Sequence, residues 1–277
     1  MNRHASISAL AFKLGMSRQN FYKGRIARRR AEVDALLVEQ LVKGERALQP
    51  RLGGRKLFKI LTPVLEKEGI KLGRDRFFDI LREKGLLVPP LPKSPGTTKF
   101  EPSLPVFHNL VATLKLTGPN QAWAADITYI RTDEGFLYLS LITDMWSRKI
   151  VGFHVGASLE TEGALSALAM ALASLRGCAK PVHHSDRGCQ YASHLYVGKL
   201  REAELQVSMT EELHCYENAM AERVNGILKQ EYYIGSCFRN KNQAKKAVKQ
   251  AVYLYNTRRP HTSLDYQTPE EMHRTAA

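Results

Sequence analysis

The sequence predicts an α/β domain, a mixed sheet flanked by helices, that is preceded by small helical units. Segments with helical spacing fill much of the chain before residue 85. A proline-rich stretch at 88–96 cannot continue a helix, and three consecutive runs with strand-like alternation follow it. Beyond those runs, helical and strand-like segments alternate, which is typical of a mixed α/β order.

Residues 5–24 have the pattern of a helix, a turn and a second short helix. Gly15 ends the first apolar stripe, and Ser17 can cap the helix that follows. Polar side chains at the start of that helix can reach groove edges or phosphates of a nucleic acid. These candidates are Arg18, Gln19 and Asn20. A plain helical hairpin without a ligand is the simpler alternative.

A basic cluster comes next, and it is better suited to touching phosphate than to reading bases. Its candidate phosphate contacts are Arg28, Arg29 and Arg30. Further helices are predicted over 31–48, 55–67 and 73–84. We therefore expect a helix-turn-helix-like and basic segment over 1–49, a second small helical DNA-binding unit over 50–88 and a linker over 89–119.

The central part begins with strands predicted over 122–131, 136–143 and 148–156. Then come a helix (160–176), a strand (181–185), a helix (193–204), a short strand (205–209) and a helix around Glu222. A three-stranded meander followed by alternating helices and strands matches a ribonuclease H-like sheet, in which the first and fourth strands are parallel neighbours. We expect this domain to span 120–235, with a basic C-terminal helix and tail over 236–277.

Three acidic residues occupy special places in this arrangement. Asp126 lies in the first predicted strand, Asp186 directly follows the fourth, and Glu222 lies on a helix. Carboxylate oxygens are the ligands that hard divalent cations prefer. A pair of such ions can activate a nucleophile and stabilise the leaving oxygen in phosphodiester chemistry. These three carboxylates are our candidate catalytic and metal-binding residues, whereas Asp144 is expected to cap its turn.

The helix that carries Glu222 places polar side chains at i, i+4, i+7 and i+11, so that they share one face. They are Asn218, Glu222, Asn225 and Lys229. A carboxylate with a lysine two turns along suits a site that holds both metals and a phosphate backbone. Asn218 and Lys229 are therefore candidate DNA contacts. The alternative is an ordinary solvated helix face.

Charge is distributed unevenly along the chain. Residues 1–99 contain 22 Lys and Arg against 9 Asp and Glu, residues 120–222 contain 8 against 13, and residues 223–277 contain 10 against 4. An acidic centre between basic flanks suits a protein that binds a polyanion, although a basic surface can also serve solubility. Arg258 and Arg259 are candidate DNA contacts in a tail whose simplest interpretation is a solvated basic helix end.

Other classes of protein are disfavoured. No apolar run approaches the ~20 residues that span a bilayer, and the N-terminus has no clear signal-peptide pattern. Four scattered cysteines without a Cys-x-x-Cys pair argue against a disulfide framework or a zinc knuckle. We therefore expect a protein without a membrane partner that stays in the compartment where it is made.

Four segments resemble the integrase-core motifs of bacterial insertion-sequence transposases, in particular the second reading frame (OrfB) of the insertion-sequence-three family. They are WAADITYI, HHSDRGCQYAS, ENAMAERVNGILKQE and YNTRRPHTSL. The resemblance runs from about Leu10 to Pro269. Glu217, where aspartate is usual, and the Gly53-Gly54-Arg55 run depart from the family pattern, and neither belongs to the three carboxylates.

The resemblance implies that Asp126, Asp186 and Glu222 form an Asp-Asp-Glu triad binding two Mg²⁺ ions, for which Mn²⁺ can substitute. It also implies that Lys229 contacts DNA near the scissile phosphate. The expected function is DNA cleavage and strand transfer by a homo-oligomer bound to element ends and target DNA, with a possible upstream-frame (OrfA) partner. The resemblance further implies a location in the bacterial cytoplasm, associated with the nucleoid. A ribonuclease H-type nuclease and a non-catalytic, transposase-derived DNA-binding protein are the alternatives.

Overall fold

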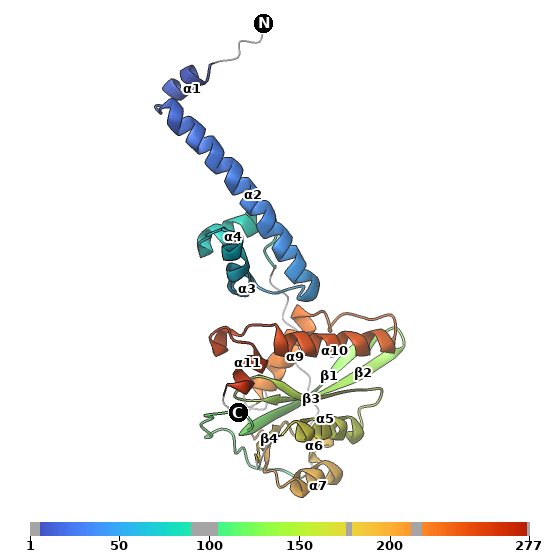
Figure 1. Cartoon of the computed structure of the whole chain (residues 1–277). Coiled ribbons are helices and arrows are strands. Elements are labelled where there is room, and N and C mark those ends of the chain that lie inside the picture. Colours follow the sequence, from blue (N-terminus) through green and yellow to red (C-terminus); the bar gives the residue numbers. More distant parts are fainter. Residues whose placement is uncertain (1–5, 90–104, 176–178, 212–217, 276–277) are drawn as a thin grey trace. The chain divides into compact units, whose positions relative to one another are not determined.

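The computed structural model describes residues 6–89, 105–175, 179–211 and 218–275 (Figure 1). Contacts divide the chain into two compact units. The first is built from the chain before residue 48 and from 53–88, and the second from 48–52 and the chain after residue 88. The predicted division of the first unit at residue 49 stays a prediction.

The first unit is helical. Gly15 ends its first helix with a φ of 65°, a conformation that glycine adopts without steric cost. Ser17 Oγ then accepts a hydrogen bond from the backbone N–H of Asn20 at 3.2 Å, which confirms the predicted cap. The helices are α1 (Ile7–Lys13), α2 (Arg18–Leu48), α3 (Gly54–Lys67) and α4 (Arg74–Glu83).

The prediction of a short second helix is wrong, because α2 runs for 31 residues through the basic cluster and the segment 31–48. Its sequence contains no proline and is rich in Arg, Ala, Leu and Glu, which favour a helix. An ion pair of 3.1 Å between Lys84 and Glu39 joins the end of α4 to α2. The buried apolar side chains of this unit include Val38, Val42, Leu57, Leu61, Leu65, Phe77, Ile80 and Leu81.

The second unit contains a five-stranded sheet of order β3-β2-β1-β4-β5. The strands are β1 (Ala122–Thr132), β2 (Gly135–Asp144), β3 (Ile150–Gly156), β4 (Val182–Ser185) and β5 (Val207–Met209). β1, β2 and β3 form an antiparallel meander, and β4 is parallel to both β1 and β5. This confirms the predicted meander and the parallel pairing of the first and fourth strands.

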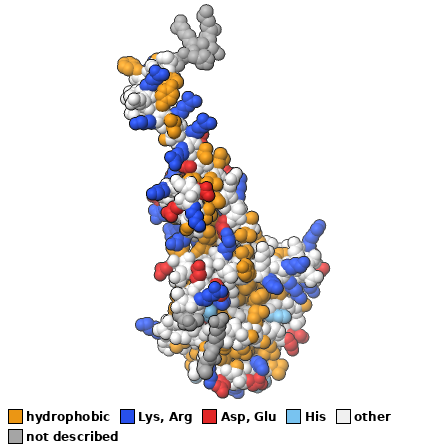
Figure 2. Space-filling model, viewed as in Figure 1, with side chains coloured by type: hydrophobic (Ala, Val, Ile, Leu, Met, Phe, Trp, Pro, Cys, Tyr) orange, Lys and Arg blue, Asp and Glu red, His pale blue; other side chains and the backbone are white. Residues whose placement is uncertain are grey.

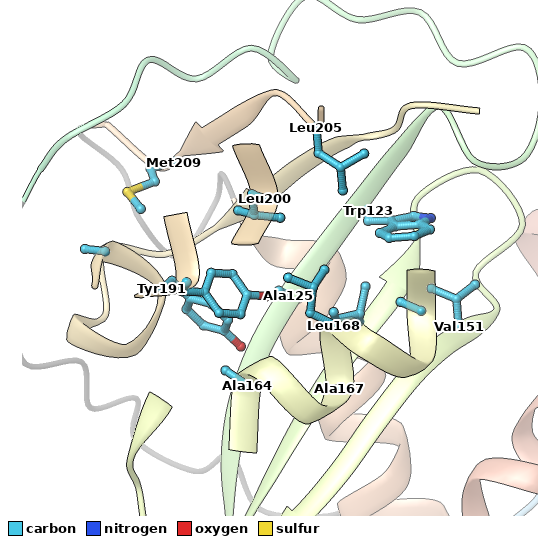
Figure 3. Close-up of a cluster of buried hydrophobic side chains, with 14 residues drawn as sticks. Trp123, Ala125, Val151, Ala164, Ala167, Leu168, Tyr191, Leu200, Leu205 and Met209 are labelled. Atoms are coloured by element: carbon cyan, nitrogen blue, oxygen red, sulfur yellow. The ribbon is translucent and has the colours of Figure 1, made fainter. Parts of the chain in front are cut away.

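Helices cover both faces of this sheet (Figure 1). They are α5 (Thr161–Ser174), α6 (Cys189–Ala192), α7 (His194–Glu202), α9 (Ala219–Glu231), α10 (Lys241–Thr257), η1 (Thr262–Leu264) and α11 (Pro269–Arg274). On one face, Trp123 and Ala125 of β1 pack in a cluster with apolar side chains of α5, α6 and α7 (Figure 3). On the other face, Ile130 of β1 packs with side chains of α9 and α10. Alternation along β1 therefore sends even-numbered residues toward α9 and α10.

Two local features position these helices. A Cβ at Gly152 would stand 2.2 Å from the Ala167 carbonyl oxygen, so only glycine lets α5 approach β3 this closely. On the other face, the Asn256 side chain of α10 both accepts from Ile150 N and donates to Ile150 O, each at 2.9 Å. Within the described residues, no helix combines the length and the apolar character needed to cross a membrane.

Candidate active site

Asp126 and Asp186 lie side by side because their strands are parallel neighbours. The register of β1 and β4 pairs Ala125 with Ser185, and each aspartate is the residue that follows this pair. Repulsion by the charge of Asp186 is one of the causes that raise the pKa of Asp126, as expected for two neighbouring carboxylates. The pairing of the two strands thus brings Asp126 and Asp186, which are distant in the sequence, together at the C-terminal end of β4.

Two donors hold the carboxylate of Asp126. Its Oδ1 accepts a hydrogen bond from the backbone N–H of Ile127 at 2.9 Å, and its Oδ2 accepts one from Asn225 Nδ2 at 2.7 Å. Burial and then the charge of Asp186 nevertheless raise the pKa of Asp126 from 3.8 to about 7, and Glu222 contributes in the same direction. The hydrogen bonds therefore do not compensate for desolvation and like charge.

Helix α9 carries both Glu222 and Lys229. Glu222 lies in the first turn and is exposed, and burial and the charge of Asp186 raise its pKa. Lys229 lies in the last turn, where burial lowers its pKa and the charge of Asp126 opposes that shift. Both side chains thus interact electrostatically with the aspartates, which agrees with the helix face predicted from spacing.

Two asparagines attach α9 to β1. Asn218 Nδ2 donates to the carbonyl oxygen of Ala125 at 3.2 Å, and Asn225 Nδ2 donates to Asp126. Their exposed fractions are only 4% and 5%. The prediction that Asn218 contacts DNA therefore disagrees with its position, because its side chain is buried against the strand. The sequence predicted the helix face on which Asn225 lies but not its role. The three-residue spacing from Glu222 was the signal that could have indicated a position near the carboxylates.

Tyr191 is a further residue near the aspartates that sequence reasoning missed. It lies on α6 within the buried cluster of Figure 3 and is 3% exposed. Burial raises the pKa of its hydroxyl well above the usual value, with smaller contributions from Tyr196, Asp126 and Asp186. Its position five residues after Asp186, inside the HHSDRGCQYAS segment, was the available signal.

The three carboxylates suit hard divalent cations in donor chemistry, because they offer only oxygen ligands. Burial and, to a smaller extent, the charge of Asp186 raise the pKa values of Asp126 and Glu222, and bound cations would relieve the repulsion between these carboxylates. In the parts of the chain that the structure describes, no three His, Cys, Asp or Glu side chains are arranged to hold a metal ion. The oxygen donors and the negative charge of the three carboxylates therefore suit metal ions, but the described side chains do not form a complete set of metal ligands.

Comparison with known proteins identifies the family. Two models described as integrase core domains match residues 117–215 and 203–269. An uncharacterized 31 kDa protein of insertion element IS600 from Shigella sonnei is 37% identical over 223 residues, which cover 78% of this chain and 82% of that protein. Transposase InsF for insertion sequence IS3A from Escherichia coli (strain K12) is 34% identical over 219 residues, or 76% and 74% of the two chains.

The chain belongs to the IS3 family of transposases. This confirms the resemblance, and DNA transposition by an integrase-type catalytic core is the function of the family. A solved intasome of simian T-cell lymphotropic virus, in complex with a PP2A regulatory subunit, shares 19% identity over 80% of this chain and 74% of the matched chain. Its TM-score of 0.50 supports the common fold.

The DNA contacts predicted in the first unit of this IS3-family chain all lie on α2 and are exposed. They are Arg18, Gln19, Asn20, Arg28, Arg29 and Arg30. Their side chains are open to solvent, as a phosphate contact requires. Their role stays a prediction, as does that of Lys229, which is half-buried beside Asp126.

The interpretation of the C-terminal tail as a solvated helix end is wrong. Arg259 is only 2% exposed, and its Nε and Nη2 donate to the two carboxylate oxygens of Glu231 at 2.8 and 2.7 Å. His261 Nε2 lies 2.9 Å from Arg259 Nη1, and Tyr255 is fully buried beside them. Arg259 therefore attaches the tail to the end of α9 and is not placed to contact DNA, whereas Arg258 is exposed.

Proposed function

We propose that this chain cleaves DNA at the ends of its insertion sequence and joins the freed ends to target DNA, with Asp126, Asp186 and Glu222 as catalytic residues. Two observations support the proposal: Asp126 and Asp186 are neighbours across the parallel strands β1 and β4, and Glu222 and Lys229 of α9 interact electrostatically with them. The relationship of the chain to named transposases supports phosphodiester chemistry as the reaction of this site.

Asp126, Asp186 and Glu222 would hold two Mg²⁺ ions, and Mn²⁺ can substitute for them. When bound, such ions neutralise charge on a scissile phosphate and favour ionisation of an attacking hydroxyl. Asp126 would bind a cation as the carboxylate, so binding would favour the loss of the proton that its raised pKa of about 7 allows it to keep below neutral pH. Asn225 keeps Oδ2 of this carboxylate in place, and Lys229 supplies positive charge for the DNA backbone.

The proposed reaction has two steps. A water oxygen first attacks the phosphorus of the phosphodiester at the element end, the bond to the 3′-oxygen breaks, and that oxygen leaves as a 3′-hydroxyl. The 3′-hydroxyl then attacks a phosphodiester in the target, forms a new phosphodiester and releases another 3′-hydroxyl. The first step replaces a phosphodiester bond with a bond from phosphorus to the water oxygen, and the second replaces one phosphodiester bond with another. Neither step therefore needs an external energy source. The contribution of the protein is positioning and charge compensation.

We also propose that the active form is a homo-oligomer assembled on DNA. Cleavage at two element ends followed by joining to one target requires two reactive sites held together. The product of an upstream reading frame is a further proposed partner, since the family resemblance implies it.

A duplex that carries the terminal repeat, mixed with a target plasmid and Mg²⁺ or Mn²⁺, tests the proposal. We expect cut and joined products from the wild type. Asp186→Asn should abolish both while leaving DNA binding largely intact. Asp133→Asn is the matched control, because it makes the same chemical change at an exposed turn of the same unit.

The outcomes separate the alternatives. Cleavage without joining would indicate a hydrolytic nuclease, and binding without cleavage would indicate a non-catalytic DNA-binding protein. An Asp186→Asn variant that cuts at the wild-type rate would remove Asp186 from the site.

A further inference from the structure

The outward face of α10 has a charge pattern that the proposed site does not use. The apolar residues of this helix, among them Ala244, Val248 and Tyr255, are buried against the sheet. The opposite side carries a stripe at i, i+4, i+7 and i+11, flanked by two further polar side chains. The stripe consists of Asn242, Lys246, Lys249 and Tyr253, and the flanking residues are Lys245 and Gln250; all six are exposed.

The lysines of this face are not neutralised. The 17 residues of α10 include four lysines and no aspartate or glutamate. In the described part of the chain, Lys245, Lys246 and Lys249 have no carboxylate partner. By contrast, Lys43 pairs with Glu39 and Lys199 pairs with Glu202 within single helices. The outward face of α10 is therefore a concentrated positive surface.

This placement of charge disfavours the helix itself. Lys245 and Lys249 are four residues apart, and like charges at this spacing repel. Lys241 also lies in the first turn of α10, where the helix dipole disfavours positive charge. Solubility alone does not require uncompensated charge of one sign, because mixed charges serve it with less repulsion.

The surroundings define where this surface begins. The carboxylate of Glu134 accepts a hydrogen bond from the backbone N–H of Lys241 at 2.9 Å, and Asp133 lies in the same turn of the sheet. The basic surface therefore starts beyond Lys241 and ends at Tyr253, whose exposed fraction is 65%. From Asn242 to Tyr253 the helix rises by eleven steps, or about 16 Å. Figure 2 shows Lys and Arg side chains gathered on the part of the second unit where α10 lies.

We propose that this face of α10 binds the phosphate backbone of duplex DNA without reading its sequence. The inference rests on the proposed function and extends it by a second DNA-contacting surface, outside the carboxylate site. α10 packs on the same face of the sheet as α9, which carries Glu222. Lysine ammonium groups attract phosphates, and the Tyr253 hydroxyl and the amides of Asn242 and Gln250 can donate hydrogen bonds to phosphate oxygens.

Salt dependence of DNA binding tests this surface directly. Each phosphate contact contributes about 0.9 to the slope of log affinity against log salt concentration. The variant Lys245→Gln/Lys246→Gln/Lys249→Gln should therefore make the slope less negative, by up to about 2.7. Binding is measured in EDTA, so that cleavage does not contribute, with one duplex carrying the terminal repeat and one of random sequence and equal length.

The chain offers a matched control on the other face of the sheet. Lys180→Gln/Lys199→Gln/Arg201→Gln removes the same formal charge from exposed positions in and near α7, and should leave the slope within experimental error. Lys245→Arg/Lys246→Arg/Lys249→Arg keeps the charge and should also bind like the wild type. Circular dichroism and thermal melting verify the fold of each variant.

An unchanged slope in the α10 variant would overturn the proposal, and so would an equal loss in the α7 control, which would indicate only an effect of net charge. A change confined to one of the two duplexes would also contradict it. If the triple variant does not fold, Lys246→Gln/Lys249→Gln gives the same test with a change of up to about 1.8. Cleavage and joining are assayed separately with Mg²⁺, so failure of this proposal is distinguishable from failure of the proposed function.

Discussion

The Asn225 side-chain amide donates a 2.7 Å hydrogen bond to Asp126 Oδ2, across 99 residues of sequence. The bond joins the helix that carries Glu222 to the strand that carries Asp126. Because the backbone N–H of Ile127 holds the other oxygen, both oxygens of Asp126 have fixed directions before any cation arrives. Such outer-shell partners orient carboxylates for metal binding.

Replacing Asn225 with alanine removes the donor to Oδ2. We expect cleavage to slow by about 10- to 100-fold, the usual cost of losing an outer-shell partner, with DNA binding unchanged. Single-turnover cleavage rates over a range of Mg²⁺ concentrations measure the effect. Gln230→Ala, at an exposed amide of the same helix, is the control. Wild-type rates for Asn225→Ala at every Mg²⁺ concentration would show that the hydrogen bond is dispensable.

Without metal, the free energy of unfolding of Asp126→Asn should exceed that of the wild type by an amount that grows as the pH rises. Burial and the charge of Asp186 raise the pKa of Asp126 from 3.8 to about 7. Between these values the folded protein holds a proton that the unfolded chain releases, so the free energy of unfolding falls with increasing pH. The asparagine of the variant does not titrate, so the variant keeps this free energy of unfolding. Its advantage over the wild type should increase by up to about 4 kcal/mol, at 1.36 kcal/mol per pKa unit.

Urea unfolding in EDTA at pH 4.5 and pH 8 measures this gain, with Asp133→Asn as the control variant. A difference between Asp126→Asn and the wild type that stays constant between the two pH values would contradict the prediction.

Mg²⁺ should raise the thermal midpoint of the wild type, because cations relieve the repulsion between the carboxylates. At 100 times the dissociation constant, binding contributes about 2.7 kcal/mol. For a unit of this size that corresponds to a shift of about 5–10 °C. Thermal melting with and without MgCl₂ measures it, and Asp186→Asn should shift much less. Equal shifts in the two proteins would place the cation elsewhere.

Arg259→Met should destabilise the second unit by about 3 kcal/mol, because it leaves the carboxylate of Glu231 without its buried partner. The double variant Arg259→Met/Glu231→Leu should recover most of this loss, since no unpaired charge remains. Chemical unfolding of the single and double variants measures both effects. Arg258→Met, at an exposed position, should change stability much less. A single variant as stable as the wild type would contradict a structural role for the ion pair.

Strand periodicity predicted that Asp126 and Asp186 lie at neighbouring strands, and helix spacing predicted the face of α9 that carries Glu222, because these patterns are local properties of the chain. Alternation along β1 identifies which side chains share a face, and the strand order requires β4 to lie beside β1. The family motifs then assigned a chemistry to that position. In the first unit, the same local reasoning divided one long helix in two, since a cluster of arginines does not interrupt α2.

Tertiary packing alone decided the roles of Asn218, Asn225 and Arg259. In the sequence an asparagine on a helix face and an arginine near a helix end look like surface groups suited to DNA. Their burial depends on which distant backbone and carboxylate groups lie opposite, namely Ala125, Asp126 and Glu231. Local pattern determines the face on which a polar side chain lies. Whether that side chain meets solvent or a buried partner depends on contacts between segments that are far apart in the chain.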